Sequence, residues 1–463
     1  MSPDLDVAVV GAGVAGLTAA HELRRAGLTV RVFEELPYVG GRMHTVRRHG
    51  YVIDEGAEQL PERGYRATWE LLARLGVTGR EVPRIGKACL GMWRDGRAHP
   101  GMADAAALVT GAGLSPRARL DLARLLAWTA RHHRRFDLDR PERSPLGART
   151  VASFARRFHP DLHDYLLQPV ASGFFGWDVA RCAAAPLVAL MREAGPVSGW
   201  RTYHDGMDLL ARRLAATLDV ATATPVHEVT DTGREVRLHG PGGAVTARAA
   251  VLAVPAPVAA RLHPGAPADE RAFLDACTFA PFLKVSCLLD RPLQAPSPRP
   301  LYALFTPDPE DDMLAGITFD HNKHPGRAPV GKGLVALVAD ARRVPELRAD
   351  DPEKTADRLV RAATRYLPGL PDALRGHVVH SFAHALPEAT PEALALRPGF
   401  AARAPRPVEY AGDWAALCPA SESAVRSGAL AASRVLARLH PSPTAAARPA
   451  AVHVPRSDRL ETA

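Results

Sequence analysis

The stretch VAVVGAGVAGLTAAHELRRAGLTVRVFEE, residues 7–35, decides the fold. Its first four residues are apolar, in a short run that is typical of a buried parallel strand. Apolar positions then repeat with helical spacing from Val14 until Gly27, and a second apolar run over residues 29–33 leads to Glu34. The order of strand, glycine turn, helix, strand and terminal acid predicts a βαβ unit that binds a dinucleotide.

The glycines and the acid of this unit each have a separate physical task. Gly11 lets the chain turn sharply, Gly13 lets the backbone approach a pyrophosphate, and Gly16 lets the helix pack closely on the strand. Glu34 can accept hydrogen bonds from both ribose hydroxyls, and it disfavours a 2′-phosphate because the two anionic groups would repel each other. NAD and FAD both remain open at this point.

Composition excludes several classes of function. The 463 residues carry a net charge of +8, spread along the chain without a basic block, which disfavours a nucleic-acid partner. The five cysteines form no CxxC pair, so neither a disulfide framework nor a structural zinc site is indicated. The longest apolar stretch, residues 249–260, is too short to span a membrane, and the first residues do not resemble a signal peptide. We therefore expect a cytoplasmic protein.

The segment EELPYVGGRMHT, residues 34–45, favours FAD over NAD as the bound dinucleotide. Gly40 and Gly41 permit a tight loop, and Arg42 can place its guanidinium fork against a phosphate. A plain NAD dehydrogenase has no need of this element. Residues 11–45 resemble the N-terminal signature of the flavin amine oxidase superfamily, which includes amine oxidases, protoporphyrinogen oxidases and phytoene-type desaturases. The resemblance implies that the glycines and Glu34 bind the ADP part of FAD and that Arg42 contacts the pyrophosphate.

Two further segments match the superfamily in the expected order. YVIDEGAEQL, residues 51–60, resembles the segment that passes the isoalloxazine ring. Residues 221–262 read as a strand, a hairpin and a strand, with turns at 231–233 and 241–243. The resemblance implies that Val226 contacts the adenine.

The segment VEYAGDWAALCPASESAVRSGALAA, residues 408–432, resembles the closing FAD motif. Asp413 would reach the ribityl and pyrophosphate groups, and a helix beginning at Ser423 and Ala424 would stabilise negative charge on the flavin with its N-terminal N–H groups. The cofactor-binding residues implied by the whole resemblance are Gly11, Ala12, Gly13, Val14, Ala15, Gly16, Glu34, Glu35, Gly41, Arg42, Gly56, Ala57, Glu58, Gln59, Val226, Gly412, Asp413, Ser423 and Ala424.

The motifs predict an α/β protein with two interleaved domains. A Rossmann-like FAD-binding domain with a parallel sheet would comprise residues 1–60, 200–274 and 401–440. An α+β substrate-binding domain would comprise residues 61–199, which are helical in pattern, and 275–400, which hold strand-like runs such as FLKVSCLLD. The Pro- and Ala-rich tail, 441–463, is expected to be disordered. The basic amphipathic segment 117–136 is interpreted as a solvated outer face in preference to a membrane contact.

Two residues are candidates for catalysis. Lys284 lies in a segment that resembles the strand carrying a water-bridged lysine beside flavin N5 in amine oxidases, and a cation there would assist the reaction of reduced flavin with oxygen. The alternative is an ordinary strand lysine at a domain edge. Trp414 follows Asp413 directly and would border the flavin or the substrate pocket, or else serve as a packing residue.

Other reactive side chains receive no catalytic role. Cys418 is not where relatives form a covalent flavin bond, so we expect noncovalent FAD. The segment DHNKH places Asp320, His321 and His324 together, but no supporting cluster appears and surface histidines are favoured over metal ligands. No metal is expected.

These observations predict an FAD-dependent oxidoreductase, an oxidase or desaturase that removes a hydride from a C–H bond of a small, largely apolar substrate. No second glycine motif is present to bind NADPH, so the substrate itself is the expected hydride donor, with oxygen or another compound as electron acceptor. Within this class, protoporphyrinogen oxidase-like or desaturase-like chemistry is placed ahead of amine oxidation at a C–N bond. A flavin-dependent isomerase or cyclase is the alternative from another class. Substrate identity and oligomeric state are not predicted.

Overall fold

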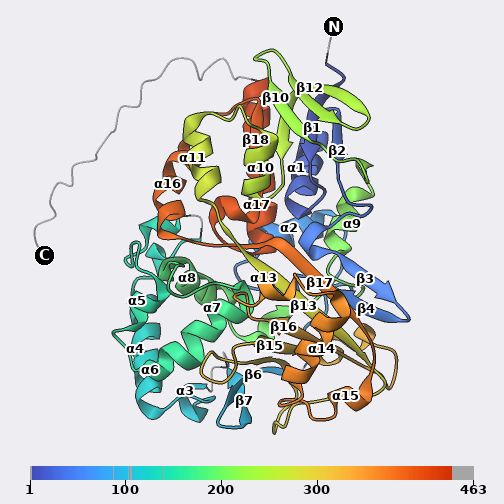
Figure 1. Ribbon diagram of the computed structural model, residues 1–463. Coiled ribbons are helices and arrows are strands. Elements are labelled where there is room, and N and C mark those ends of the chain that lie inside the picture. The colour runs from blue at the N-terminus through green and yellow to red at the C-terminus, as the bar shows by residue number, and fades with distance from the viewer. Residues whose placement is uncertain (1–2, 87, 103, 105–106, 139, 441–463) are drawn as a thin grey trace, which may run out of the picture.

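The computed structural model describes residues 3–86, 88–102, 104, 107–138 and 140–440, so the predicted disordered tail lies outside the described residues. Two seven-stranded sheets organise this part of the chain. The first sheet lies at the top of Figure 1, the second lies below it, and a group of helices flanks the second sheet.

The first sheet has a parallel core and an antiparallel edge. The parallel strands follow the order β18, β12, β1, β2 and β9, and β10 and β11 continue from β12 as antiparallel strands. Val10, the last residue of β1, pairs with Leu252 and with Phe33, so the carboxyl ends of three strands meet at one edge. This arrangement confirms the predicted parallel sheet. The strands are β1 (Leu5–Val10), β2 (Val30–Phe33), β9 (Asp219–Ala221), β10 (Glu228–Asp231), β11 (Val236–Gly240), β12 (Gly243–Leu252) and β18 (Val408–Tyr410).

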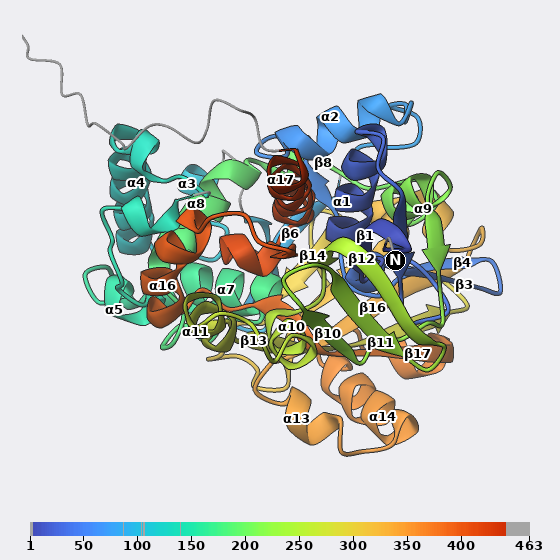
Figure 2. The same cartoon turned by 90° about the horizontal axis from the view of Figure 1, so that it is seen from above.

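Helices cover this sheet, and two of them from distant parts of the sequence, residues 14–25 and 421–439, pack against each other. A Cβ added at Gly428 would stand 2.3 Å from the carbonyl oxygen of Ala15, so the C-terminal helix lies directly against the first helix. The view from above in Figure 2 shows these two helices, α17 and α1, side by side. The helices near this sheet are α1 (Val14–Arg25), α2 (Arg66–Arg74), α9 (Leu209–Ala215), α10 (Ala256–Leu262), α11 (Ala268–Ala276), α16 (Pro391–Ala402) and α17 (Ser421–Leu439).

The second sheet follows the order β17, β13, β16, β15, β14, β6 and β7, antiparallel throughout except for the β14–β6 pair. Two of its strands come from residues 89–102, in a segment whose pattern suggested helices. Their short apolar runs carry no clear alternation, so the sequence pattern did not reveal them. The strands are β6 (Cys89–Arg94), β7 (Arg97–Met102), β13 (Phe279–Leu289), β14 (Leu301–Phe305), β15 (Leu314–Phe319), β16 (Gly333–Ala339) and β17 (Leu374–Pro387).

The remaining elements cover the second sheet or link the two sheets. The helices are α3 (Ala107–Thr110), α4 (Pro116–Arg131), α5 (Val151–Ala155), α6 (Pro160–Leu162), α7 (Gln168–Phe175), α8 (Ala184–Ala194), α12 (Asp320–Lys323), α13 (Val344–Leu347), α14 (Pro352–Ala363) and α15 (Leu370–Ala373). The short strands are β3 (Thr45–Arg48), β4 (Tyr51–Asp54), β5 (Leu60–Pro61) and β8 (Trp200–Arg201). The single turns are η1 (Gly41–Met43), η2 (His133–Arg135), η3 (Pro141–Arg143), η4 (His163–Leu167), η5 (Val197–Gly199), η6 (Pro325–Arg327) and η7 (Asp413–Ala416).

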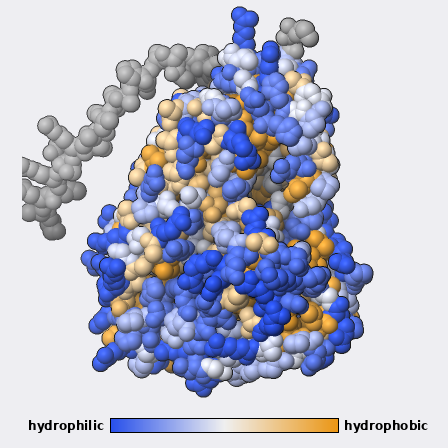
Figure 3. Space-filling model, viewed as in Figure 1, coloured by the Kyte–Doolittle hydropathy of each residue, from blue (hydrophilic) through white to orange (hydrophobic). Residues whose placement is uncertain are grey.

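The predicted amphipathic segment forms α4 and η2. Leu125 on this helix is buried, whereas Leu120 and Leu126 are about half exposed. Among the described residues no helix combines the length and apolar character needed to cross a membrane. Hydrophilic residues cover most of the face shown in Figure 3, and hydrophobic residues form smaller groups between them. The assignment of residues to two domains stays a prediction.

Candidate active site

One large cavity lies between the carboxyl edge of the first sheet and the second sheet with its helices. Its volume is about 1510 Å³, and its wall includes Gly11 at the end of β1 as well as Phe305 at the end of β14. Pockets for drug-sized ligands occupy roughly 300–1,000 Å³. The cavity is therefore large enough for a dinucleotide and a second molecule together.

The glycine turn shapes one end of this cavity. Gly11 adopts a φ of +101°, and a Cβ there would stand 2.6 Å from the carbonyl oxygen of Ala253. A Cβ at Gly16 would stand 2.0 Å from the carbonyl oxygen of Gly11. Gly13 lines the cavity, and its added Cβ would meet no atom within 4 Å. Two glycines thus allow close packing, whereas the third keeps open the space in front of the α1 N-terminus, where a pyrophosphate would fit.

Glu34 follows β2 and lies at the cavity wall with its carboxylate anchored to the backbone. It accepts hydrogen bonds from the N–H of Ala12 at 2.7 Å and from the N–H of Leu36 at 2.9 Å. Burial raises the pKa of this carboxyl, although the two N–H donors oppose the rise. Ala12 does not itself line the cavity, but its N–H orients the carboxylate of Glu34, which does. Glu35 and Val226 also line the cavity.

Arg42 and Asp413 meet at the cavity wall. Two guanidinium nitrogens of Arg42 donate to the two carboxylate oxygens of Asp413, at 2.8 and 2.7 Å. The same guanidinium donates to the carbonyl oxygen of Ala385 at 2.5 Å. A Cβ at Gly56 would stand 2.4 Å from the carbonyl oxygen of Arg42, so this segment also lies close to the arginine. Two residues for which sequence resemblance implied pyrophosphate contacts are thus brought together.

The start of α17 borders the same cavity. The helix begins at Ser421, two residues earlier than expected, and Ser423 and Ala424 lie in its first turn at the cavity wall. Glu422 accepts from the backbone N–H groups of Ala67 and Thr68, which fastens α17 to the beginning of α2. Sequence reasoning missed this contact.

Trp414 and Cys418 also line the cavity. The indole of Trp414 is fully buried, donates to the carbonyl oxygen of Val254 at 3.1 Å and packs among Phe273, Phe400 and Tyr410. Burial raises the pKa of Cys418 to about 12, so its thiol stays protonated at neutral pH.

Lys284 differs in position from the other candidates, because it does not line the cavity. Its side chain is 1% exposed. The ammonium donates to the carbonyl oxygen of Asp54 at 2.5 Å and to a carboxylate oxygen of Glu58 at 2.6 Å. Glu58 does line the cavity, as do Gly56, Ala57 and Gln59. The lysine therefore lies one layer behind the wall.

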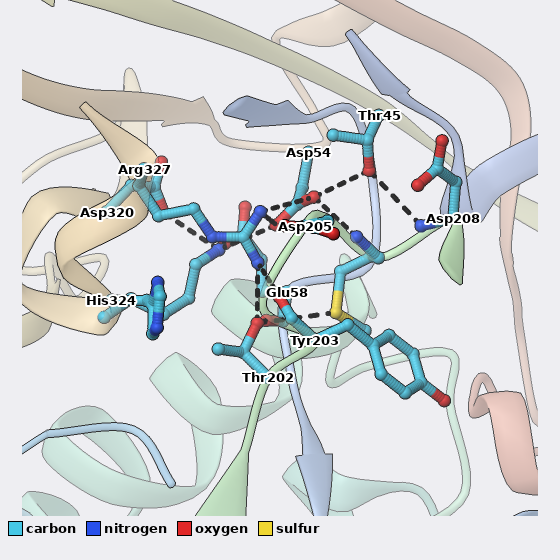
Figure 4. A network of polar contacts seen from close by, with 12 residues as sticks. Thr45, Asp54, Glu58, Thr202, Tyr203, Asp205, Asp208, Asp320, His324 and Arg327 are labelled. Atoms are coloured by element: carbon cyan, nitrogen blue, oxygen red, sulfur yellow. Dashed lines mark hydrogen bonds and ion pairs between the residues drawn. The ribbon is translucent and has the colours of Figure 1, made fainter. Parts of the chain in front are cut away.

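A buried charge cluster surrounds this lysine. Asp54, at the end of β4, accepts from Thr45, from Lys323 and from Arg327, and Figure 4 shows it between Arg327 and Thr45. Burial alone would raise the pKa of Asp54, but Arg327 and Lys323 outweigh this effect and hold the pKa below its ordinary value. The cluster stabilises ionised carboxylates directly behind the cavity wall.

Lys323 and Arg327 were missed by sequence reasoning, which considered only Asp320, His321 and His324 in this part of the chain and favoured surface histidines over metal ligands. Both side chains are fully buried. Burial opposes the charge on Lys323, but Asp320, Glu58 and Asp54 outweigh it and raise the lysine pKa well above its ordinary value. No local sequence signal distinguishes these two residues from exposed ones, because a lysine or arginine in a polar run is usually exposed.

Many apolar side chains line the other part of the cavity. Leu122 and Leu125 of α4 and Phe174 of α7 face the space from the helical side, and Phe305 and Ile317 face it from the second sheet. Such a wall accommodates an apolar molecule next to the polar end that holds the glycine turn.

Comparisons with known proteins agree with this geometry. The family model for flavin-containing amine oxidoreductases matches residues 14–436. Protoporphyrinogen oxidase 2 of Arabidopsis thaliana is 32% identical over 169 residues, which cover 36% of this chain and 32% of the plant protein. The matched part is thus about a third of that relative's length.

Solved structures resemble the whole chain in fold. Cyclohexylamine oxidase from Brevibacterium oxydans has a TM-score of 0.76 at 19% identity, covering 94% of this chain and 100% of that one. A protein described as a putative protoporphyrinogen oxidase, from an Exiguobacterium species, has a TM-score of 0.71 at 18% identity, covering 94% and 99%. These similarities support the α/β fold described above.

Proposed function

Because the chain belongs to the family of flavin-containing amine oxidoreductases, we propose that it removes a hydride from a C–H bond of a small, largely apolar substrate. FAD is the cofactor of this family, and the chain is an FAD-dependent oxidoreductase. The observation that carries the finer proposal is the single cavity in which the glycine turn and a wall of apolar side chains share one space.

The polar end of the cavity would hold FAD noncovalently. Glu34 would accept from the ribose hydroxyls, and the open space at Gly13 would receive the pyrophosphate at the N-terminus of α1. Arg42, oriented by Asp413, would add a cation, and the first turn of α17 would face the pyrimidine edge of the flavin. We propose residues 1–60, 200–274 and 401–440, which include the first sheet, as the FAD-binding domain, and residues 61–199 and 275–400, which include the second sheet, as the substrate-binding domain.

The apolar end would bind and orient the substrate. When bound, FAD supplies the chemistry of hydride acceptance and later passes the electrons to an acceptor. Side chains such as Phe174 and Phe305 would exclude water and hold the reacting C–H bond in place. The substrate would lose one hydride, which carries both electrons, to the bound cofactor, and one proton to solvent. Oxygen, if it is the acceptor, becomes hydrogen peroxide.

The likeness to Arabidopsis protoporphyrinogen oxidase 2 supports a protoporphyrinogen oxidase-like or desaturase-like reaction. Amine oxidation is the alternative, and a specific observation favours it. The charge cluster behind the wall at Glu58 is balanced, so this part of the cavity would accept an amine in its neutral form, the form that can release a hydride. A flavin-dependent isomerase without net redox change would share the same cofactor site.

The visible spectrum of the purified protein tests the proposal first. We expect flavin absorption at about 450 nm, released by mild denaturation because the cofactor is noncovalent. Anaerobic bleaching by an apolar C–H donor or by an amine then identifies the substrate class. Bleaching by neither class, with turnover of an unsaturated substrate to an isomer, would overturn the oxidoreductase reaction proposed here. Hydrogen peroxide release on admitting air would identify oxygen as the acceptor.

A further inference from the structure

Glu58 is held by two buried lysines. One carboxylate oxygen lies 2.6 Å from the Lys284 ammonium, and the other contacts the Lys323 ammonium. The two lysine side chains are 1% and 0% exposed, whereas Glu58 is 14% exposed and lines the cavity. The carboxylate therefore stands between the Lys284 charge and the cavity.

The lysines come from different parts of the chain. Lys284 belongs to β13 in the second sheet, and Lys323 belongs to α12. Lys323 is also bound to Asp320 at 3.0 Å and to Asp54 at 3.1 Å, which fixes its position independently of Glu58. Glu58 is thus clamped by a lysine that other carboxylates hold in place.

The charges of this cluster balance. Its anions are Asp54, Glu58 and Asp320, and its cations are Lys284, Lys323 and Arg327. Because the ion pairs are buried, solvent screens them little, and removal of one charge leaves a net field that extends into the cavity. Of these six residues, Glu58 is the one that lines the cavity.

We propose that Glu58 cancels the charge of Lys284 toward the bound flavin and that Lys323, paired with the other oxygen of Glu58, offsets part of the negative charge that Glu58 presents to the flavin. The inference rests on the proposed function, together with the resemblance of residues 51–60 to the segment that passes the isoalloxazine ring. The cluster would set the midpoint potential of the flavin, with Glu58 lowering it and Lys323 raising it. A reduced flavin and a flavin with bound sulfite both carry negative charge, so each is stabilised by a net positive field.

The test measures sulfite affinity and midpoint potential of the FAD-loaded protein, neither of which is turnover. In Glu58→Gln the Lys284 charge is no longer cancelled, and we expect sulfite affinity to rise by about tenfold. The same change in the reduced-to-oxidised equilibrium is a potential higher by about 30 mV for two electrons. In Lys323→Met both quantities should fall by a similar factor, and Lys323→Arg should restore them.

Matched variants separate this role from a structural one. Lys332→Met removes an exposed lysine and should leave both quantities unchanged. If Lys323→Met does not fold, Asp320→Asn combined with Lys323→Met removes a whole ion pair, and Glu58 then keeps only Lys284 as a partner. In that double variant the sulfite affinity should still fall relative to Asp320→Asn alone.

The outcomes distinguish this inference from the proposed function. A protein that binds no flavin overturns the proposed function. A protein that binds flavin, but whose Glu58→Gln variant shows sulfite affinity within twofold of the parent or below it, overturns the inference and leaves the proposed function standing.

Discussion

Arg42 and Asp413 lie 371 positions apart and form a two-point ion pair at the wall of the cavity. The side chain of Asp413 is 7% exposed and that of Arg42 is 33% exposed, so a buried carboxylate fixes a guanidinium that is partly accessible. A guanidinium fixed in this way keeps donors free for a second anion, because it carries five N–H groups.

Replacement of Arg42 by Met should weaken FAD binding by about 10- to 100-fold, because a charged hydrogen-bonding partner contributes roughly 1.5–3 kcal/mol. Arg42→Lys should recover part of the loss, since it keeps the charge but not the fork. The FAD-to-protein ratio and a titration of the cofactor-free protein measure the effect. If Arg42→Met bound FAD with unchanged affinity, a contact between Arg42 and the FAD pyrophosphate would be excluded.

Ala substitutions at Gly13 and Gly16 should have different effects. At Gly16 the new Cβ would stand 2.0 Å from a backbone oxygen, so Gly16→Ala should destabilise the fold itself. At Gly13 the Cβ would meet no atom within 4 Å, so Gly13→Ala should fold normally but bind FAD weakly. Thermal unfolding without added FAD, followed by FAD titration, separates the two effects. Equal melting temperatures for the two variants would contradict this reasoning.

The size of the apolar end should depend on Gly173. A Cβ at this position would stand 2.6 Å from the ring of Phe305, which lines the cavity. We expect Gly173→Ala to displace the ring and to raise KM several-fold for a bulky substrate, with little change in kcat. Steady-state kinetics with large and small substrates of one series measure this. A KM change of the same size for both would point to a general loss of structure.

Asp54 should make stability depend on pH. Its pKa is held below the usual 3.8 because Arg327 and Lys323 outweigh burial. The contribution of the ionised Asp54 to the free energy of unfolding is therefore complete above pH 3.8, the usual pKa, and is lost as the pH falls below 3.8 through the lowered pKa of the folded protein. Asp54→Asn removes the carboxylate that pairs with the buried Arg327 and Lys323 and should lower the free energy of unfolding by about 3–5 kcal/mol at pH 7. The difference in the free energy of unfolding between the parent protein and Asp54→Asn should become smaller from pH 4 to pH 3.

Urea unfolding at several pH values measures this gap. Asp357→Asn is the matched control, because Asp357 is 73% exposed and its pair is worth little. A gap that stays constant down to pH 3 would show that the carboxylate of Asp54 is not the titrating group.

The glycine turn, the strand that ends at Glu34 and the helix near Ser423 were predicted from the sequence, because each depends on local backbone chemistry. The partners of Lys284 were not predicted from the sequence. Its burial against Glu58 depends on how β13 meets the segment after β4, and no local pattern encodes that meeting. Lys323 was missed for the same reason, since a lysine in a polar run is usually exposed.

The strands β6 and β7 were missed for a different reason. Residues 89–102 lie next to helical segments in sequence but join a sheet whose other strands begin at residue 279. Pairing over that distance is decided by tertiary packing, which overrides a weak local pattern. Which side chains of this sheet face the cavity could therefore not be predicted.

The pairing of β18 with β12 has a consequence for biosynthesis. Asp413 follows β18 closely, so the wall it shares with Arg42 is completed only after residue 413 has left the ribosome. Contacts of such sequence separation form late, because a long loop must close first. We expect the cavity of newly made chains to stay open until FAD binds. The supply of FAD in the cell would then control the yield of protease-resistant protein. Cell-free translation with and without FAD, followed by brief proteolysis, would measure this dependence.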